Sequence, residues 1–140
     1  MFFSYDENLS IHVPFPFSRI MTPFMTTDTA DGKIDFSVHM TEWESGAQVD
    51  EHMHTDSTEA MYCLSGSGSA SVGKNMYDLK PNTMITALPG QLHWIKNTGT
   101  ETLKVLCIFS PAISAAGLRE RAEKAVKEYK KNKKNQDICK

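Results

Sequence analysis

The chain has 140 residues, of which 40% are hydrophobic and 23% are charged, and its formal net charge is -2. This composition excludes a disordered or collagen-like chain and fits one globular domain with a core of its own. No apolar run approaches the roughly 18 residues that a membrane span requires, so we expect a protein without membrane contact.

The expected compartment follows from the N-terminus and the cysteines. Asp6 and Glu7 come directly after the first apolar residues, a pattern unlike a secretory leader. Cys63, Cys107 and Cys139 are odd in number and widely spaced, which argues against a disulfide scaffold and fits a reducing compartment. We therefore expect a cytoplasmic protein.

Residues 1–30 are expected to form short extended segments. Pro14 and Pro16 exclude a central strand there and indicate an edge or a covering arm of the same domain. Residues 34–43 then alternate with period two, which predicts a half-buried strand. One face of this strand is apolar and the other is polar; the apolar face holds Ile34, Phe36, Val38 and Met40, and the polar face holds Asp35, Ser37, His39 and Thr41.

Short strands are predicted through the middle of the chain, separated by Gly, Pro and Asn turns. Strands with such turns at close spacing predict an antiparallel sandwich or barrel. We therefore predict an all-β barrel over residues 31–110. The expected strands cover residues 47–54, 59–64, 69–72, 76–79, 84–88, 92–96 and 103–109.

Residues 111–140 are predicted to form an amphipathic helix and a basic tail. Apolar residues recur at threes and fours after Ser114, a plausible N-cap. Residues 118–140 carry nine Lys or Arg and four acids, a net charge of +5, which leaves -7 on the remainder. A basic run can bind nucleic acid, but this one lacks interleaved aromatics or a nucleic-acid motif, so we interpret it as a solvated helix face.

Three histidines and one glutamate form the pattern that points to chemistry. His52 and His54 are two residues apart, so on a strand both imidazoles point to the same face. Glu59 follows a polar loop that can turn its carboxylate toward the pair, and His93 can approach from a distant strand. This set suits one divalent transition metal per chain, such as Mn, Fe, Ni, Co, Cu or Zn. Around an octahedral ion it leaves two open positions.

The same residues resemble the first motif of the cupin family. Gly46-x5-His52-x-His54-x4-Glu59-x6-Gly66 agrees with that motif at each defined position. The resemblance implies a double-stranded β-helix, the cupin jelly roll, with the metal inside the barrel. Cupins of this size are commonly dimers, so the resemblance also implies a homodimer.

The second cupin motif is matched in part. Gly90-x2-His93-x3-Asn97 agrees with its second half, whereas Pro89 lies one place late. Asn82 occupies the position of the first glycine. Because Asn is among the residues that best tolerate a positive φ, we expect the turn to form there. Neither difference affects a ligand.

Strand parity predicts further site residues. Glu59 and His39 are the candidate catalytic groups. His39 could act as an acid or base if the polar face of its strand lines the cavity, and it has no role if that face meets solvent. A largely apolar cavity would suit a small organic substrate. The predicted pocket residues are Phe36, Met40, Met61, Cys63, Met84 and Ile95.

These features predict a metal-dependent enzyme that acts on a small carboxylate, keto or hydroxy compound. The expected chemistry is that of an isomerase, lyase or decarboxylase, in which the metal serves as a Lewis acid. An iron-dependent dioxygenase and a non-catalytic small-ligand-binding cupin are the alternatives. The family supports all of these, so the fold does not choose among them. We expect a small-molecule partner and no nucleic acid.

Overall fold

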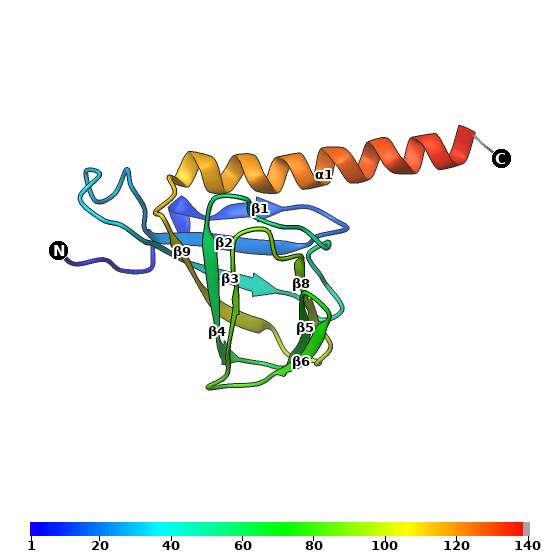
Figure 1. Ribbon diagram of the computed structural model, residues 1–140, viewed down its shortest axis with the longest axis horizontal. Coiled ribbons are helices and arrows are strands. Elements are labelled where there is room, and N and C mark those ends of the chain that lie inside the picture. Colours follow the sequence, from blue (N-terminus) through cyan, green and yellow to red (C-terminus); the bar gives the residue numbers. More distant parts are fainter. Residues whose placement is uncertain (139–140) are drawn as a thin grey trace.

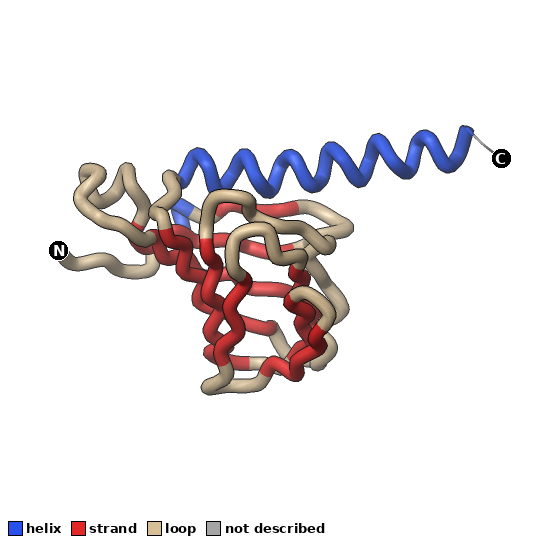
Figure 2. The backbone as a smooth tube through the Cα atoms, in the orientation of Figure 1, coloured by secondary structure: helices blue, strands red, loops and turns tan. Residues whose placement is uncertain are grey.

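The computed structural model describes residues 1–138, which form two antiparallel sheets and one long helix (Figures 1 and 2). The larger sheet has six strands in the order β1-β2-β3-β9-β4-β7, and the smaller has three in the order β6-β5-β8. The predicted fold class, an all-β double-sheet barrel with a C-terminal α-helix, is confirmed. The elements are η1 (Glu7–Leu9), β1 (Ile11–Val13), β2 (Arg19–Met25), β3 (Ser37–Trp43), β4 (Thr58–Ser65), β5 (Gly68–Val72), β6 (Asn75–Leu79), β7 (Met84–Ala87), β8 (His93–Asn97), β9 (Leu103–Ser110) and α1 (Ala115–Ile138).

The polar face of β3 is the one that turns into the barrel. Ser37, His39 and Thr41 are buried, whereas Val38 and Met40 are only half-buried. The register explains this, because His39 pairs with Cys107 of β9, and Cys107 pairs with Met61 of β4. Cross-strand partners share a face, so these side chains form one inward row. The polar side chains therefore line the interior.

The first strands extend the six-stranded sheet beyond the barrel. β1 is the edge strand and pairs only with residues 19–21 of β2. Pro23 lies past the end of β1, where the missing N–H breaks no pairing with that strand. The domain boundaries predicted at residues 30 and 110 stay predictions, although β1 and β2 belong to the same sheet as β3.

The segment predicted as a strand at residues 47–54 forms no continuous strand. It makes two isolated bridges to β8, Gln48 with Lys96 and His52 with His93. Between the bridges, Val49 packs on the core and donates its N–H to the Ile95 carbonyl oxygen at 2.9 Å, whereas Asp50 and Glu51 are exposed. The buried face is therefore too short to hold a regular ladder. The segment instead runs along the open edge of the three-stranded sheet.

Helix α1 closes one end of the barrel. Ser114 caps it, since its hydroxyl accepts the Gly117 backbone N–H at 2.9 Å. Figure 1 shows α1 lying along β1, with its C-terminal part extending past the strands. One hydrophobic core fills the barrel and includes Met61, Leu103 and Val105. A second hydrophobic core joins the helix to β1 and β2 and includes Leu118, Met21 and Ile11. No helix within residues 1–138 combines the length and the apolar character needed to cross a bilayer.

Two turns contain residues with a positive φ angle, Asn82 and Gly66. Asn82 has φ +70°, so this residue adopts the left-handed conformation expected where a glycine is usual. Gly66 has φ +81°, and a Cβ atom there would lie 2.6 Å from the Thr102 carbonyl oxygen. The chain can therefore pass between β4 and β5 only with glycine at this position.

Candidate metal centre and its cavity

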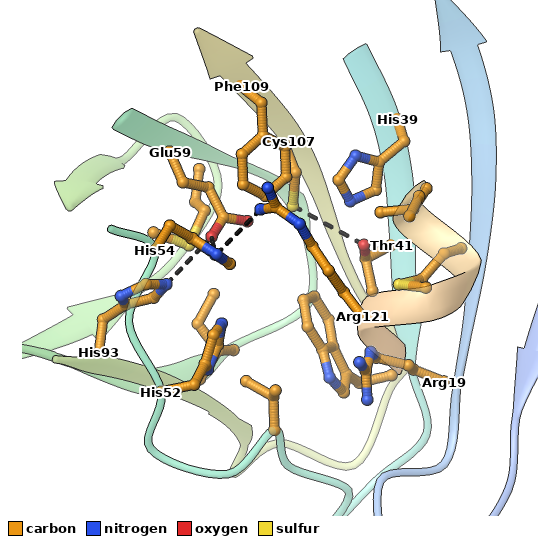
Figure 3. Close-up of a pocket in the computed structure, with 16 residues that line it drawn as sticks. Arg19, His39, Thr41, His52, His54, Glu59, His93, Cys107, Phe109 and Arg121 are labelled. Atoms are coloured by element: carbon orange, nitrogen blue, oxygen red, sulfur yellow. Dashed lines mark hydrogen bonds and ion pairs between the residues drawn. The ribbon is translucent and has the colours of Figure 1, made fainter. Parts of the chain in front are cut away.

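Four side chains converge at one end of the barrel (Figure 3). His52 and His54 come from the segment between β3 and β4, Glu59 from β4 and His93 from the start of β8. One potential ligand atom from each residue lies within 4.8 Å of those of the other three. The structure therefore brings together all four residues that the sequence predicted as ligands.

The carboxylate lies between two of the imidazoles. Glu59 Oε2 is 3.1 Å from His54 Nε2 and 3.0 Å from His93 Nε2. The ring centroids of His52 and His93 are 4.3 Å apart. The four groups lie close enough together for a single ion to bind all of them in place of the direct contacts between histidine and glutamate.

Backbone carbonyls orient two of the rings. His52 Nδ1 lies 2.8 Å from the Asp50 carbonyl oxygen, and His93 Nδ1 lies 2.9 Å from that of Gln91. A carbonyl can only accept, so each Nδ1 donates and each Nε2 is left with a free lone pair when the ring is neutral. This is the usual outer arrangement of a metal-binding histidine.

His54 has a different outer partner. Its Nδ1 lies 2.9 Å from Arg121 Nη1, and a guanidinium can only donate. The Arg121 guanidinium also lies over the Phe109 ring, 5.1 Å from its centroid. Figure 3 shows Arg121 reaching from α1 into the site. The helix thus contacts a candidate ligand directly.

The pKa values of Glu59, His52 and His93 depart from their ordinary values. Burial alone would raise the pKa of Glu59, but hydrogen bonds from His54 and His93 outweigh it and hold that pKa well below its usual range. Burial lowers the pKa of His52 to about 4. For His93 burial also lowers the pKa, but the bond to Glu59 outweighs it and the net pKa is raised. Glu59 is therefore ionised and His52 neutral near pH 7, as metal ligation requires.

The donor set fits a divalent transition metal. Three imidazole nitrogens and one carboxylate oxygen suit first-row ions, and two oriented Nδ1 donors support the geometry. Structural zinc sites favour cysteine and a closed shell, and this set contains no cysteine. The four residues could therefore hold an ion whose coordination shell keeps open positions, as in catalytic metal sites.

A cavity of about 70 Å³ adjoins the four residues. Among the predicted pocket residues, Met61 and Ile95 line it, as does His39. The hydrophobic walls include Phe109 and Leu118, which exclude water from one side of the site. The cavity is small, so an occupant in this conformation has few atoms.

Four predicted pocket residues lie elsewhere. Phe36 precedes β3 and is 45% exposed, and Met84 is 54% exposed because it pairs with Tyr62 on the outer face of the sheet. Met40 points outward from β3, opposite in parity to His39. Cys63 does point inward, but it is packed in the hydrophobic core rather than at the cavity wall. For Phe36 and Met40 the wrong step was to assume that the apolar face of β3 turns inward.

His39 faces the cavity with an unpaired ring. It is 4% exposed, stacks on Phe109 with ring centroids 5.7 Å apart, and makes no hydrogen bond within residues 1–138. Burial lowers its pKa to about 4. A potential ligand atom of His39 also lies within 4.8 Å of those of Glu59 and Cys107. A neutral imidazole in this position could accept a proton from a molecule in the cavity.

Other lining residues were not predicted from the sequence. Thr41 and Trp43 share the parity of His39, so inverting the two faces of β3 would have found both. Arg121 lies one turn after Leu118 and could have been sought on the apolar side of the helix. Arg19 follows a proline-rich stretch without a recognisable motif, so no signal identified it.

A wider vestibule leads to this cavity from outside. Its volume is about 590 Å³, and it lies between the segment at residues 49–56 and helix α1. The two spaces share lining residues, among them Arg19, His52 and Arg121. These shared residues lie where the two spaces adjoin.

The family assignment comes from residues 39–109, which match the family model described as "Cupin domain". That match covers just over half of the chain. This chain belongs to the cupin family. The assignment agrees with the two-sheet barrel and with the two motifs that contain the candidate ligands.

Curated relatives of this cupin carry an enzyme name. This chain is 33% identical over 85 residues to L-ectoine synthase of Bordetella avium, a match that covers 59% of this chain and 62% of that protein. It is also 32% identical over 82 residues to L-ectoine synthase of Bordetella petrii, a match that covers 56% of this chain and 59% of that protein. The chain therefore spans about three fifths of the length of these relatives.

Solved structures show the same fold. Ectoine synthase from P. lautus has a TM-score of 0.68 at 18% identity, with 86% of each chain covered. A predicted oxalate decarboxylase from Thermotoga maritima has a TM-score of 0.61 at 20% identity, covering 66% of this chain and 80% of that one. At these identities the likeness establishes the architecture alone.

Proposed function

We propose that this cupin is a metal-dependent enzyme that acts on a small carboxylate, keto or hydroxy compound. The observation that carries the proposal is the convergence of three imidazoles and one carboxylate beside a small cavity. Relatives named L-ectoine synthase support small-molecule chemistry. The proposed reaction class is that of an isomerase, lyase or decarboxylase.

The roles of individual residues follow from their positions. His52, His54, Glu59 and His93 would hold one divalent transition ion, which would supply a Lewis acid with two open positions. His39 faces the same cavity and would accept or return a proton at the substrate. Isomerase and lyase reactions move such a proton, which is why we favour them.

The assembly and location are part of the same proposal. We infer a homodimer, as small cupins commonly form, and a cytoplasmic protein. Cys63 and Cys107 are buried free thiols, which supports a reducing compartment. Light scattering during size-exclusion chromatography tests the dimer, since a monomeric mass at micromolar concentration would contradict it.

Elemental analysis of untagged protein, together with assays of oxygen consumption and turnover, tests the proposed metal-dependent activity. The substrate panel holds small acids and ketones together with the substrate of L-ectoine synthase. We expect about one first-row divalent ion per chain and turnover without oxygen uptake. Iron with oxygen uptake would instead establish a dioxygenase. No bound metal and no turnover would leave a non-catalytic ligand-binding cupin.

A further inference from the structure

Arg19 is a buried cation that forms no ion pair among the described residues, although the Glu59 carboxylate lines the same cavity. It is 9% exposed and makes one hydrogen bond within residues 1–138, from Nη1 to the Phe17 carbonyl oxygen at 3.1 Å. The exposed loop carboxylates Asp50 and Glu51 border the same vestibule, yet neither forms an ion pair with it. Burying a charge is unfavourable unless the charge is paired, so this guanidinium is suited to receive an anion.

Trp43 presents a second unused donor beside it. The indole is 3% exposed, and its Nε1 has no hydrogen-bond partner among the described residues. Buried N–H groups are nearly always paired with protein or ordered water, so this indole N–H is available to donate to an acceptor that enters the cavity. Both Trp43 and Arg19 line the same cavity as the candidate metal ligands.

The strand register places these two donors next to each other. Arg19 of β2 pairs directly with Trp43 of β3. Directly opposed residues in an antiparallel ladder share a face, with Cβ atoms about 5 Å apart. Figure 3 shows Arg19 on the other side of the cavity from His93. The two donors therefore form one group on the cavity wall, and Arg19 lies across the cavity from His93.

We propose that Arg19 and Trp43 form a carboxylate-binding subsite that anchors one end of the substrate in the cavity. The guanidinium donates to the carboxylate oxygens, and the indole N–H completes the site. A tetrahedral phosphate would require more donors than this pair offers. The assignment of the other end of the substrate to the metal rests on the proposed function, whereas carboxylate binding by this pair does not.

The test uses full-length protein freed of metal with a chelator, so that an anion cannot be held by an ion. The chain contains two tryptophans, Trp43 and Trp94, so its two indole N–H signals can be assigned by NMR with Trp43→Phe. Acetate, pyruvate and succinate are titrated to about 100 mM, a range that covers millimolar affinities. Acetamide is the neutral control for acetate, and inorganic phosphate tests the anion class.

We expect carboxylates, but not acetamide, to shift the Trp43 indole N–H signal and to leave that of Trp94 in place. Arg19→Gln should weaken acetate binding about tenfold, as loss of a charge-assisted pair predicts. Arg119→Gln, the same change at an exposed helix position, should leave it unchanged. Arg19→Lys keeps the charge and should bind with intermediate affinity if Arg19→Gln does not fold.

Three results would overturn the subsite. The first is the absence of a Trp43 shift with all three carboxylates in wild-type protein. The second is equal acetate affinity in wild-type protein and a folded Arg19→Gln or Arg19→Lys variant. The third is tighter binding of phosphate than of acetate. Because the titration needs neither metal nor turnover, these results are independent of the metal analysis that tests the proposed function.

Discussion

Asn97 is fully buried, and its side-chain amide contacts three backbone groups. Its Nδ2 donates to the carbonyl oxygens of Trp43 at 2.9 Å and Glu101 at 2.8 Å, and its Oδ1 accepts the Gly99 N–H at 3.0 Å. This asparagine ends the second cupin motif. Its place in that motif therefore has a structural cause, because it ties β3 to the turn after β8.

Asn97→Ala tests this account of the motif. The substitution removes three hydrogen bonds to the backbone, although the Gly99 N–H keeps its bond to the Ser67 carbonyl oxygen at 3.2 Å. We therefore expect the free energy of unfolding to fall by about 3 kcal/mol. Urea denaturation measures the change. Asn75→Ala, at an exposed position in β6, is the matched control and should stay within about 0.5 kcal/mol of wild type. A similar small effect in both variants would contradict the structural role.

His39 predicts a dependence of stability on pH. Burial lowers its pKa from 6.5 to about 4, so between these values the unfolded state binds the proton more readily. Its contribution to stability is present above pH 6.5 and is lost as the pH falls toward 4. The full effect is about 3 kcal/mol, since one pKa unit corresponds to about 1.4 kcal/mol.

We expect His39→Asn to reduce the slope of unfolding free energy against pH between 4 and 6.5 in metal-free protein. Urea denaturation across this range gives the slope. His12→Asn, the same substitution at an exposed histidine in β1, is the matched control for the loss of an imidazole outside the cavity. If the slope in the His39→Asn variant equals that of wild type, His39 does not titrate as its burial implies.

The sequence identified the candidate ligands but only part of the cavity. Each ligand belongs to a short motif whose residue types carry the chemistry, so spacing was enough to find it. Cavity residues depend on which face of a strand turns inward. For β3 the hydrophobic pattern indicated the wrong face, because the barrel interior there carries polar groups such as His39 and Thr41.

At the scale of secondary-structure elements, α1 links the outside of the domain to the site. Its apolar side packs on β1 and β2, and this packing carries Leu118 and Arg121 to the cavity. The periodicity of residues 115–129 predicted the helix and its apolar stripe. It could not predict the end of the barrel on which the helix lies, because that depends on contacts with distant strands.

Arg121→Gln tests the link between α1 and the candidate metal centre. The guanidinium donates to His54 Nδ1, and it places a positive charge close to where a cation would bind. Removing that charge should tighten divalent metal binding by about threefold to tenfold, as a screened charge interaction predicts. Calorimetric titration of metal-free protein measures the affinity. Arg119→Gln should bind like wild type, and weaker binding by Arg121→Gln would contradict the account.

At the scale of the whole molecule, both sheets and the helix meet at the candidate site. The larger sheet contributes Glu59 and His39, the smaller contributes His93, and the segment joining β3 to β4 contributes His52 and His54. The alternation of short strands and turns predicted the barrel. It could not predict that residues 47–54 form bridges instead of a strand, because their pairing depends on β8, about 40 residues further along the chain.

This arrangement makes the metal affinity a property of the folded barrel. The ligands lie on segments far apart in sequence, so an ion that binds them stabilises the native state by mass action. Loss of one ligand should therefore lower metal affinity while the two hydrophobic cores keep the barrel folded. His93 is the most informative position, since it is the ligand from the smaller sheet.

The most direct measurement is the metal content of His93→Ala compared with wild type and His12→Ala, each reconstituted with the same ion and freed of excess. The account predicts about one ion per chain in wild type and His12→Ala. It predicts loss of most of the ion from His93→Ala, with far-UV circular dichroism unchanged. Full metal retention by a folded His93→Ala variant would contradict the site.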